Sequence, residues 1–370
     1  MTGFLEALGR AGQTARVVSW AGFLDDPDSL TRGTSEPAIL RIEAFGEDIG
    51  VAQRLLKLGA AWARREGVWV ATDAELAALP QRYGAILAPR QLHMGFETIL
   101  YDISETVGPP SWTLLTPPST ISLCFDKRRT ADFFRTLGIP VPRTIDLDRD
   151  EYPNGAMVKL ASGSSASCLG IYRRGKSGPS FFTTMEQTET GLYNSLRTRT
   201  YRGEPPESLV RLLRREGAHI EEFIPKASIE GQNFDLRILL VGGEPAFTVV
   251  RSSPQPITNL HLGGTRGDPA RLPDVVPAHV LAGIDAAMRT IGTALPALHL
   301  GVDVLIEAHP EPGSPGFRVL ELNAFGDLLP GLTRRAPDDG GVSRDWSVYD
   351  WEIRAALAQY ARSARRGSGY

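Results

Sequence analysis

Cysteine is scarce in this chain, with only Cys124 and Cys168 among 370 residues. Two thiols cannot build a disulfide framework, and by themselves they cannot complete a zinc site. Cys168 stands in a stretch of small residues with no histidine nearby in the sequence, so we interpret it as a packing residue rather than a nucleophile. This cysteine usage is typical of a reducing compartment, and we expect a cytoplasmic protein.

Strong net charge and long apolar runs are also missing. The formal net charge of -3 and the isoelectric point near 6.1 give no reason to expect nucleic acid or a membrane as a partner. No apolar run approaches the length of a transmembrane helix, and residues 1–13 lack the regions of a signal peptide. The composition, 42% apolar and 22% charged, is typical of a soluble enzyme of two or three domains.

A Walker-type phosphate loop is absent, because no Gly-Lys-Ser or Gly-Lys-Thr follows the small-residue stretch at 161–170. The strand expected at residues 156–160 is nevertheless interrupted by Lys159, and a lysine inside a strand is costly without an anionic partner. Backbone N–H groups of glycine and serine can curl around phosphate oxygens, which Lys159 can also reach. The stretch is therefore either a phosphate cradle or a simple linker.

Oxygen ligands stand on two short apolar runs, residues 301–306 and 318–323, near the C-terminus. Because side chains alternate along a strand, Glu321 and Asn323 point the same way, and Asp303 on a neighbouring strand would complete the set. Three such ligands suit a hard octahedral cation, Mg²⁺ or alternatively Mn²⁺. The simpler interpretation is two strands that end in polar residues at the rim of a sheet.

The N-terminal third alternates short apolar runs with helical patterns. We expect strands at residues 15–20, 38–42 and 84–88 and a helix at 49–65, which together predict a parallel sheet flanked by helices. Asp48 precedes that helix, where it either caps the helix or helps to form an anion site. Proline pairs at 109–110 and 117–118 then interrupt the chain, and we place a domain boundary near Leu123.

The following elements come in a definite order. A helix is expected at residues 126–137 with Lys127 in its first turn, and strands are expected at 219–225 and 233–243, the second ending in a glycine hairpin turn. Arg251 and the segment 258–264 follow. A C-terminal amphipathic helix, residues 346–361, is expected to dock on the body of the protein.

In this order the elements resemble the ATP-grasp superfamily and, within it, the RimK-like ligases that join an amine to a carboxylate. The resemblance covers residues 127–332, and the segment before it resembles the pre-ATP-grasp domain. It implies an α/β protein with an N-terminal parallel-sheet domain (1–122) followed by a two-lobed α+β ATP-grasp module. The central lobe would span 123–222 and the C-terminal lobe, with the metal site and terminal helix, 223–370.

The resemblance implies how a nucleotide would be held. Lys127 and Lys159 would contact the phosphates, and the loop containing Ser164 and Ser165 would close over them. Asp235 matches the ribose-binding acid of the family, although Glu230 competes for this role. Adenine would be held at the hinge between the lobes, by one acidic side chain and the backbone of the segment Glu221, Glu222, Phe223 and Ile224.

The resemblance also implies the reacting end of the site. Asp303, Glu321 and Asn323 match the family's ligands for two magnesium ions, and Arg251 and Asn259 match residues beside the transferred phosphate. For the neighbouring histidine, His261, we favour a structural role over proton transfer.

The implied activity is an ATP-dependent ligation that forms an amide or peptide bond through an acyl phosphate and releases ADP and phosphate. The substrates would be an amino acid, a peptide or a peptide-like metabolite. Two alternatives remain open, an ATP-grasp kinase and a non-catalytic nucleotide-binding regulatory module. A homodimer is compatible with the resemblance, but no sequence feature demonstrates it.

Two departures from the family concern substrate recognition. After Asn323 the residues 324–331 lack the Ser-Pro-Gly turn of many relatives. Residues 172–217 form a long excursion, for which we expect an ordered lid or substrate clamp in which Arg197 and Arg199 grip a carboxylate. A plain surface helix is the alternative.

Overall fold

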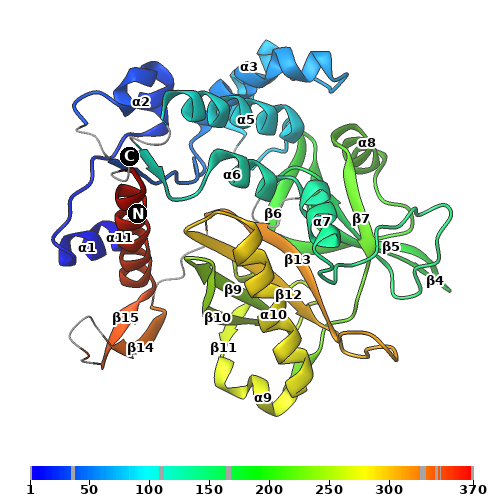
Figure 1. Ribbon diagram of the computed structural model, residues 1–370. Helices are drawn as coiled ribbons and strands as arrows, with labels where there is room; N and C mark the ends of the chain where they lie inside the picture. Colours follow the sequence, from blue (N-terminus) through cyan, green and yellow to red (C-terminus); the bar gives the residue numbers. More distant parts are fainter. Residues whose placement is uncertain are drawn as a thin grey trace.

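The computed structural model describes residues 2–34, 38–82, 84–107, 112–163, 168–325, 331–337, 341 and 343–367. It confirms the predicted α/β class, with one small parallel sheet and two larger antiparallel sheets (Figure 1). No helix in this described part is both long and apolar enough to cross a membrane.

The N-terminal part is mostly helical. Its elements are α1 (Thr2–Arg10), α2 (Trp20–Asp25), η1 (Pro27–Leu30), β1 (Ala38–Leu40), α3 (Ile49–Arg65), α4 (Asp73–Ala78), η2 (Leu79–Gln81), α5 (Pro89–Thr106), β2 (Trp112–Leu114) and α6 (Pro118–Phe125). The strands β1 and β2 pair in parallel, as predicted, but the sheet has only these two strands. Helix α3 has the predicted bounds, and Asp48 caps it by accepting a hydrogen bond from the Val51 N–H at 3.0 Å.

Two strands were predicted in this part that the structure does not contain among its described residues. Residues 15–19 make no strand pairing, and Ser19 caps α2 by accepting a hydrogen bond from the Gly22 N–H. Val17 is 52% exposed, whereas Val18 and Trp20 pack against the main core from a loop and a helix end rather than from a strand. The expected strand at 84–88 makes only one isolated bridge, from Ala85 to Tyr193, and its last residue, Ala88, has left-handed backbone before α5.

The central part is a five-stranded antiparallel sheet in the order β6-β5-β4-β3-β7. Its elements are α7 (Lys127–Thr136), β3 (Ala156–Leu160), β4 (Gly170–Gly175), β5 (Gly178–Thr188), β6 (Gly191–Arg202), α8 (Glu207–Glu216) and β7 (Ala218–Glu222). Residues 172–217 were expected to form a separate lid, and this prediction is wrong. They supply most of β4, all of β5 and β6, and the helix α8, whose Leu209 and Leu212 pack on the sheet.

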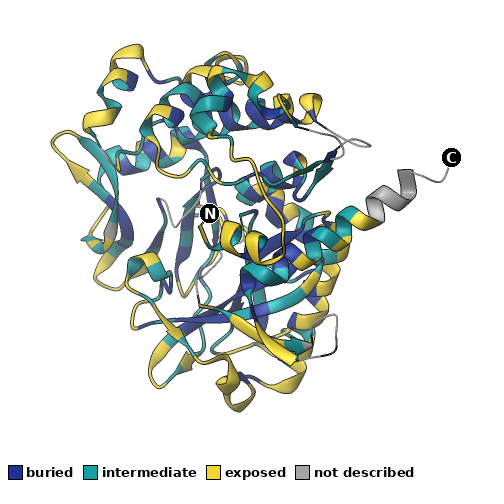
Figure 2. Ribbon diagram, turned by 90° about the vertical axis from the view of Figure 1, so that its left-hand side faces the viewer, coloured by how far each residue is buried: buried dark blue, intermediate teal, exposed yellow. Residues whose placement is uncertain are grey.

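The third part is a six-stranded sheet in the order β11-β10-β9-β12-β13, with β8 added beside β9. Its elements are β8 (Ser228–Ile229), β9 (Gln232–Val241), β10 (Glu244–Ser253), η3 (Leu260–Leu262), β11 (Thr265–Gly267), η4 (Pro269–Arg271), α9 (Leu272–Val275), α10 (Ala278–Ala294), β12 (His299–Ile306) and β13 (Phe317–Asn323). Helix α10 covers one face of this sheet and contributes Met288 and Ile291 to the main core (Figure 1). Every residue of β12, which lies between β9 and β13, is buried. Figure 2 shows that buried residues gather in the interior strands and helices and that exposed residues lie mostly in the outer loops.

The C-terminal elements are β14 (Thr333–Pro337), β15 (Ser343–Ser347) and α11 (Val348–Gly367). The expected helix starts two residues later than predicted, because Trp346 belongs to β15. Its first half docks on the body as expected, with Val348 and Trp351 against Phe247 and with α1 beside it (Figure 1).

Candidate nucleotide site between the two large sheets

A cleft lies between the five-stranded and the six-stranded sheet. Its empty volume, with the open solvent at its mouth included, is about 910 Å³. The cleft gathers most of the residues that the sequence singled out: Lys127, Lys159, Glu221, Glu222, Phe223, Ile224, Asp235, Arg251, Asn259, Asp303 and Glu321.

Three further predicted residues are not among those that line the cleft. Asn323 is the next residue on the same face of β13 as Glu321, and Ser164 and Ser165 lie outside the described residues. Arg197 and Arg199 belong to β6 and do not line the cleft, and the expected clamp stays a prediction.

Lys127 stands where α7 begins, directly after Asp126, which caps the helix by accepting from the N–H groups of Arg128 and Arg129. Its Nζ donates a hydrogen bond to the Gly163 carbonyl at 2.7 Å and lies 4.0 Å from Glu321 Oε2. Burial lowers the pKa of Lys127, and the Glu321 carboxylate only partly offsets this effect. The ammonium therefore gains from any further anion that enters the cleft.

Lys159 has a closer carboxylate. Its Nζ donates to Glu221 Oε2 at 2.6 Å, and Glu221 Oε1 lies 2.9 Å from His219 Nε2. Burial alone would raise the pKa of Glu221, but Lys159 and His219 outweigh it and hold that pKa at about 2. Burial likewise opposes the charge of Lys159, but Glu221 and Glu321 keep its pKa above the ordinary value. Both groups are therefore charged at neutral pH.

The mouth of the cleft has an apolar side beside the hinge segment. Met157, Leu169, Ile257 and Leu320 line it, and Phe223 packs against Ile257. An apolar lining of this kind suits a planar heterocycle. Glu222 accepts a hydrogen bond from the Arg143 N–H at 3.0 Å, so this side chain points toward the segment before β3.

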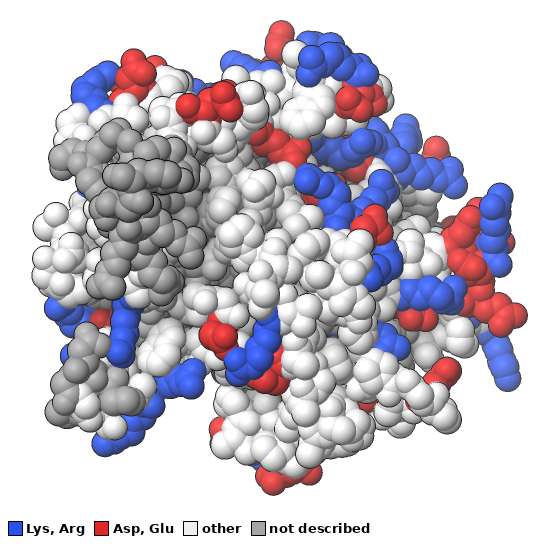
Figure 3. All heavy atoms as spheres, viewed as in Figure 1, with Lys and Arg blue, Asp and Glu red and all other residues white. Residues whose placement is uncertain are grey.

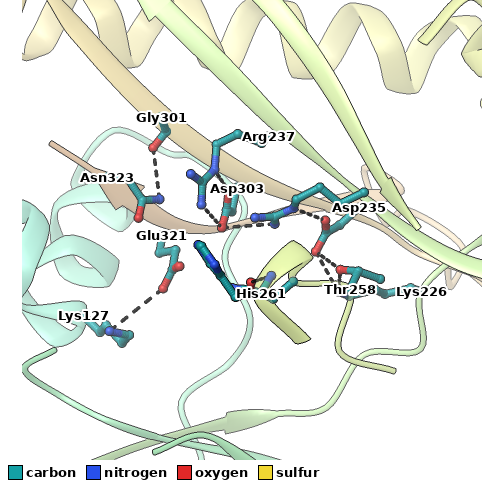
Figure 4. A network of polar contacts seen from close by, with 12 residues as sticks. Lys127, Lys226, Asp235, Arg237, Thr258, His261, Gly301, Asp303, Glu321 and Asn323 are labelled. Atoms are coloured by element: carbon teal, nitrogen blue, oxygen red, sulfur yellow. Dashed lines mark hydrogen bonds and ion pairs between the residues drawn. The ribbon is translucent and has the colours of Figure 1, made fainter. Parts of the chain in front are cut away.

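Asp235 is the centre of a buried group of donors (Figure 4). Its Oδ2 accepts from Lys226 Nζ at 2.7 Å and from Thr258 Oγ1 at 2.5 Å, and its Oδ1 accepts from Arg251 Nε at 2.7 Å. Burial would raise the pKa of this carboxyl, but Lys226 and Arg251 outweigh it and hold the pKa well below its usual range. Both oxygens are engaged, and the ribose role of Asp235 stays a prediction. Its competitor Glu230 is exposed, pairs with Arg271 and does not line the cleft.

Asp303 faces two guanidinium groups. The strand register places Arg237 opposite Asp303 and Arg251 opposite Asp235, so the four charges alternate across β10, β9 and β12. Arg237 forms a two-pronged ion pair with Asp303, and Arg251 Nη2 lies 3.1 Å from Asp303 Oδ2 (Figure 4). Burial works against ionisation, but the two arginines lower the pKa of Asp303, and the carboxylates raise that of Arg251.

The predicted metal ligands share one region of the sheet. Asp303 and Glu321 are direct partners across β12 and β13. The Asn323 amide nitrogen lies 3.4 Å from the Gly301 carbonyl, which leaves the amide oxygen as a donor for a cation (Figure 4). Two carboxylates and an amide oxygen are chemically suited to Mg²⁺ or Mn²⁺. No group of three or more His, Cys, Asp or Glu side chains with metal-binding geometry occurs in the described ranges, so the site stays a prediction.

Sequence reasoning missed three polar residues in and beside the cleft, Lys226, Arg237 and Thr258. Arg237 could have been found as Lys159 was, since it is a cation inside an apolar strand and shares a face with Asp235. Lys226 and Thr258 lie in loops, and only the structure brings them to the same carboxylate. Asn259 lines the cleft as expected, while its side-chain oxygen accepts from the His261 N–H and caps the turn η3.

Charge elsewhere on the surface is mixed. On the face shown in Figure 3, Lys and Arg side chains lie beside Asp and Glu side chains, and the described residues form no broad patch of one sign there.

Comparisons with known proteins find only distant structural similarity. No family model and no curated protein matches the chain. Solved structures similar to it include the macrocyclase MdnC with its precursor peptide from Microcystis aeruginosa MRC (17% identity, 74% of this chain and 71% of that chain, TM-score 0.39). A RiPP-associated ATP-grasp ligase from Chryseobacterium gregarium is similar at 12% identity (74% and 68%, TM-score 0.38).

A third similar structure is the N5-carboxyaminoimidazole ribonucleotide synthetase from Thermotoga maritima, at 14% identity (86% and 75%, TM-score 0.36). All three TM-scores lie below 0.5, so this likeness is too distant to assign an activity to the chain.

Proposed function

We propose that this protein is an ATP-dependent carboxylate–amine ligase of the ATP-grasp, RimK-like type. The observation that carries the proposal is the cleft between two antiparallel sheets, in which Lys127, Lys159, the hinge segment, Arg251 and the pair Asp303–Glu321 all meet. We further propose that the hinge divides the ATP-grasp lobes at residues 123–222 and 223–370, with 1–122 as the preceding domain. The substrates would be a carboxylate and an amine on an amino acid, a peptide or a peptide-like metabolite.

The charge distribution supports a triphosphate as the ligand. Lys127 and Lys159 enter the cleft from α7 and β3, and Arg251 enters from β10 on the opposite side. Phosphate oxygens between these groups would receive three cationic contacts. The apolar side, with Met157 and Ile257, would accept the base. A divalent cation held by Asp303, Glu321 and Asn323 would neutralise phosphate charge.

The proposed reaction has two steps. A carboxylate oxygen of the first substrate attacks the γ-phosphorus, the bond to the β,γ-bridging oxygen breaks, and ADP leaves. The amine of the second substrate then attacks the acyl carbon, phosphate leaves, and the nitrogen loses a proton to give the amide. Lys159 and Arg251 would stabilise the charge on the transferred phosphoryl group, and Arg251 would hold the acyl oxygens as the tetrahedral centre forms.

Arg251 is held rigidly for this role. Its Nε pairs with Asp235 and its Nη2 pairs with Asp303. Asp235 is itself held by hydrogen bonds from Lys226 and Thr258. A cation positioned in this way loses little conformational freedom when an anion arrives.

The test is mass spectrometry of the purified protein with Mg-ATP and pooled amino acids, peptides and metabolites, with oxygen-18 in the carboxylates. We expect new amide masses, ADP, and one oxygen-18 atom in the released phosphate. AMP in place of ADP would exclude the phosphoryl mechanism, and a phosphorylated metabolite would identify a kinase. Nucleotide binding without any turnover would support the regulatory module.

Variants sharpen this test. Glu321→Gln removes a charge from the proposed metal site, and we expect a loss of turnover of at least roughly a hundredfold, typical of removing one electrostatic contact to the transition state. The matched control is Glu311→Gln, an exposed position in the β12–β13 connection, which should keep full turnover. Equal turnover in both variants would contradict the assignment of Glu321.

A further inference from the structure

The side chain of Asn194 makes two partly buried contacts at the C-terminal end of the glycine- and serine-rich stretch. Asn194 lies on β6, and its Oδ1 accepts a hydrogen bond from the Cys168 backbone N–H at 3.1 Å and from Thr184 Oγ1 at 2.9 Å. Because the Cys168 N–H can only donate, the amide must present its oxygen here. The two contacts therefore define how this side chain is oriented.

The backbone that Asn194 holds is strained. Cys168 has a φ of 54°, in the left-handed region that non-glycine residues rarely adopt, and its side chain is 1% exposed. The next carbonyl, that of Leu169, accepts from Thr183 Oγ1 at 2.7 Å and from the Thr184 N–H at 3.2 Å. Such a conformation persists only where surrounding contacts fix it. Here the side chains of Asn194 and Thr183 and the backbone N–H of Thr184 supply these contacts.

Leu169 connects this arrangement to the cleft. It lines the apolar side together with Met157 and Ile257, directly after Cys168. The Asn194 side chain does not itself line the cleft. Any influence it has on a bound nucleotide must therefore act through the Cys168–Leu169 backbone.

The backbone of Asn194 has a second partner in the N-terminal part. Its N–H donates to the Gly84 carbonyl at 3.0 Å, and the Ile86 N–H donates to the Leu192 carbonyl at 2.9 Å. Residues 84–86 thus extend the outer edge of β6, and the Arg82 side chain contacts Tyr193 and the Thr190 carbonyl beside them. Asn194 is the residue at which this added edge and the base of the loop meet.

We propose that Asn194 is a positioning residue of the nucleotide pocket, which sets the apolar wall at Leu169 and links this wall to the N-terminal segment 84–86. The inference rests on the proposed function for the identity of the ligand, Mg-ATP. The hydrogen bond itself does not depend on that function. The side chain of Asn194 contacts the backbone beside this wall and its main-chain N–H contacts the N-terminal part, so one residue joins the two.

The first test follows amide hydrogen exchange at Cys168 in the free protein, which reports directly on the bond to Asn194. Asn194→Leu has nearly the same shape but no acceptor, and we expect exchange to become roughly tenfold faster, the usual effect of losing one hydrogen bond. Asn194→Asp keeps an acceptor oxygen and should restore most of the protection. Unchanged exchange in Asn194→Leu would overturn the proposal.

The second test measures nucleotide affinity and kinetics on the same variants. For Asn194→Leu we expect the Kd and the KM for Mg-ATP to rise roughly tenfold with kcat within about twofold, because the lost contact shapes binding rather than chemistry. A merely structural role would lower the active fraction, and thus kcat, at constant KM. That result, or an Asn194→Asp variant as impaired as Asn194→Leu, would contradict the proposal.

Controls keep the two ideas separate. Asn154→Leu, in the exposed turn before β3, should leave both readouts unchanged. If Asn194→Leu does not fold, Thr184→Val replaces it, because this variant removes one of the two donors to Asn194 Oδ1. It should also speed the amide exchange of Cys168, and unaltered exchange would contradict the positioning role of Asn194. If the wild-type protein binds no Mg-ATP, the proposed function fails, whereas the exchange of Cys168 still decides the role of Asn194.

Discussion

The charged side chains of the cleft are arranged as pairs and hubs rather than as isolated groups. Asp235 takes three donors, Asp303 takes two arginines, and Glu221 joins Lys159 to His219. Buried charges are stable only when paired, so each of these contacts contributes to folding as well as to ligand binding. A substitution at such a site therefore affects two properties, and a useful prediction separates them.

Asp235→Asn tests the hub by removing the carboxylate charge while keeping its shape. Lys226 would lose its carboxylate partner and Arg251 one of its two, and we expect the free energy of unfolding to fall by about 3 kcal/mol. Urea unfolding at pH 7 measures the change. Glu230→Gln is the control, since the Glu230 side chain is 73% exposed and its loss should cost less than about 0.5 kcal/mol.

The same two variants compare the candidates for the ribose. If the Asp235 carboxylate contacts the nucleotide, Asp235→Asn should weaken nucleotide binding well beyond Glu230→Gln when both are measured under folding conditions. A weaker affinity in Glu230→Gln alone would move the ribose assignment to Glu230.

Among the secondary-structure elements, the crossing of α3 and α5 shows how glycine decides the geometry of the N-terminal part. Gly59 and Gly95 face the opposite helix, and a Cβ at either position would collide with backbone atoms, those of Gln91 and Leu55 respectively. The helices therefore pack backbone to backbone, and Gln91 uses this approach to donate to the Leu56 carbonyl at 2.6 Å.

Gly59→Ala should force these helices apart. We expect a loss of about 2 kcal/mol in the free energy of unfolding, as for other overpacked contacts. Gly9→Ala in α1 is the matched control, because a Cβ there meets nothing within 4 Å and the higher helix propensity of alanine should add about 0.5 kcal/mol. Thermal unfolding of both variants gives the comparison, and a neutral Gly59→Ala would contradict the close packing.

At the scale of the whole molecule, a buried group joins the first and last parts of the chain to the centre. Arg41, just after β1, donates to Glu352 Oε2 on α11 at 2.7 Å, and His299 Nδ1 at the start of β12 lies 3.3 Å from Glu352 Oε1. Glu43 and Tyr349 are the other titratable groups beside this carboxyl. Burial raises the pKa of Glu352 to about 7, and burial together with Arg41 lowers the pKa of His299 to about 3.

These two shifts have opposite effects on stability. The folded pKa of Glu352 is raised from 4.5, so its contribution is present below pH 4.5 and is lost as pH rises toward 7. The folded pKa of His299 is lowered from 6.5, so its contribution is present above pH 6.5 and is lost as pH falls toward 3. Between pH 4.5 and 6.5 the free energy of unfolding therefore changes with pH in opposite directions for the two groups, and the two changes offset each other in the wild-type protein.

Single variants should reveal the pH dependence that each group contributes. Glu352→Gln keeps only the contribution of His299, and we expect this variant to lose stability relative to wild type as pH falls from 6.5 to 4.5. His299→Asn keeps only the contribution of Glu352, and this variant should gain stability relative to wild type as pH falls over the same range. A full shift of two pKa units corresponds to about 3 kcal/mol. Urea midpoints at several pH values test the prediction, and parallel curves for all three proteins would refute it.

Much of the architecture follows from local sequence. The helix at 49–65, the strand at 156–160 and the hairpin turn after β9 were predictable, because strand alternation, helix caps and glycine turns depend on neighbouring residues. Lys159 and Glu321 were predictable as site residues for the same reason, since a charge in an apolar strand calls for a partner.

Other features depend on contacts between residues far apart in the chain. The apolar run at 84–88 pairs with β6 rather than with the N-terminal sheet, and the segment 172–217 is part of a sheet rather than a lid. Both outcomes depend on which strand edge is available, and local periodicity carries no information about that.

The sequence by itself therefore determined the order of the elements and the chemical types of the residues that line the cleft. The tertiary structure alone decided that Asp303 faces Arg237 and Arg251, that Lys226 and Thr258 reach Asp235, and that Asn194 holds Cys168. The physical reason is that strand register and loop packing set these pairs, and both are fixed only when the whole core closes.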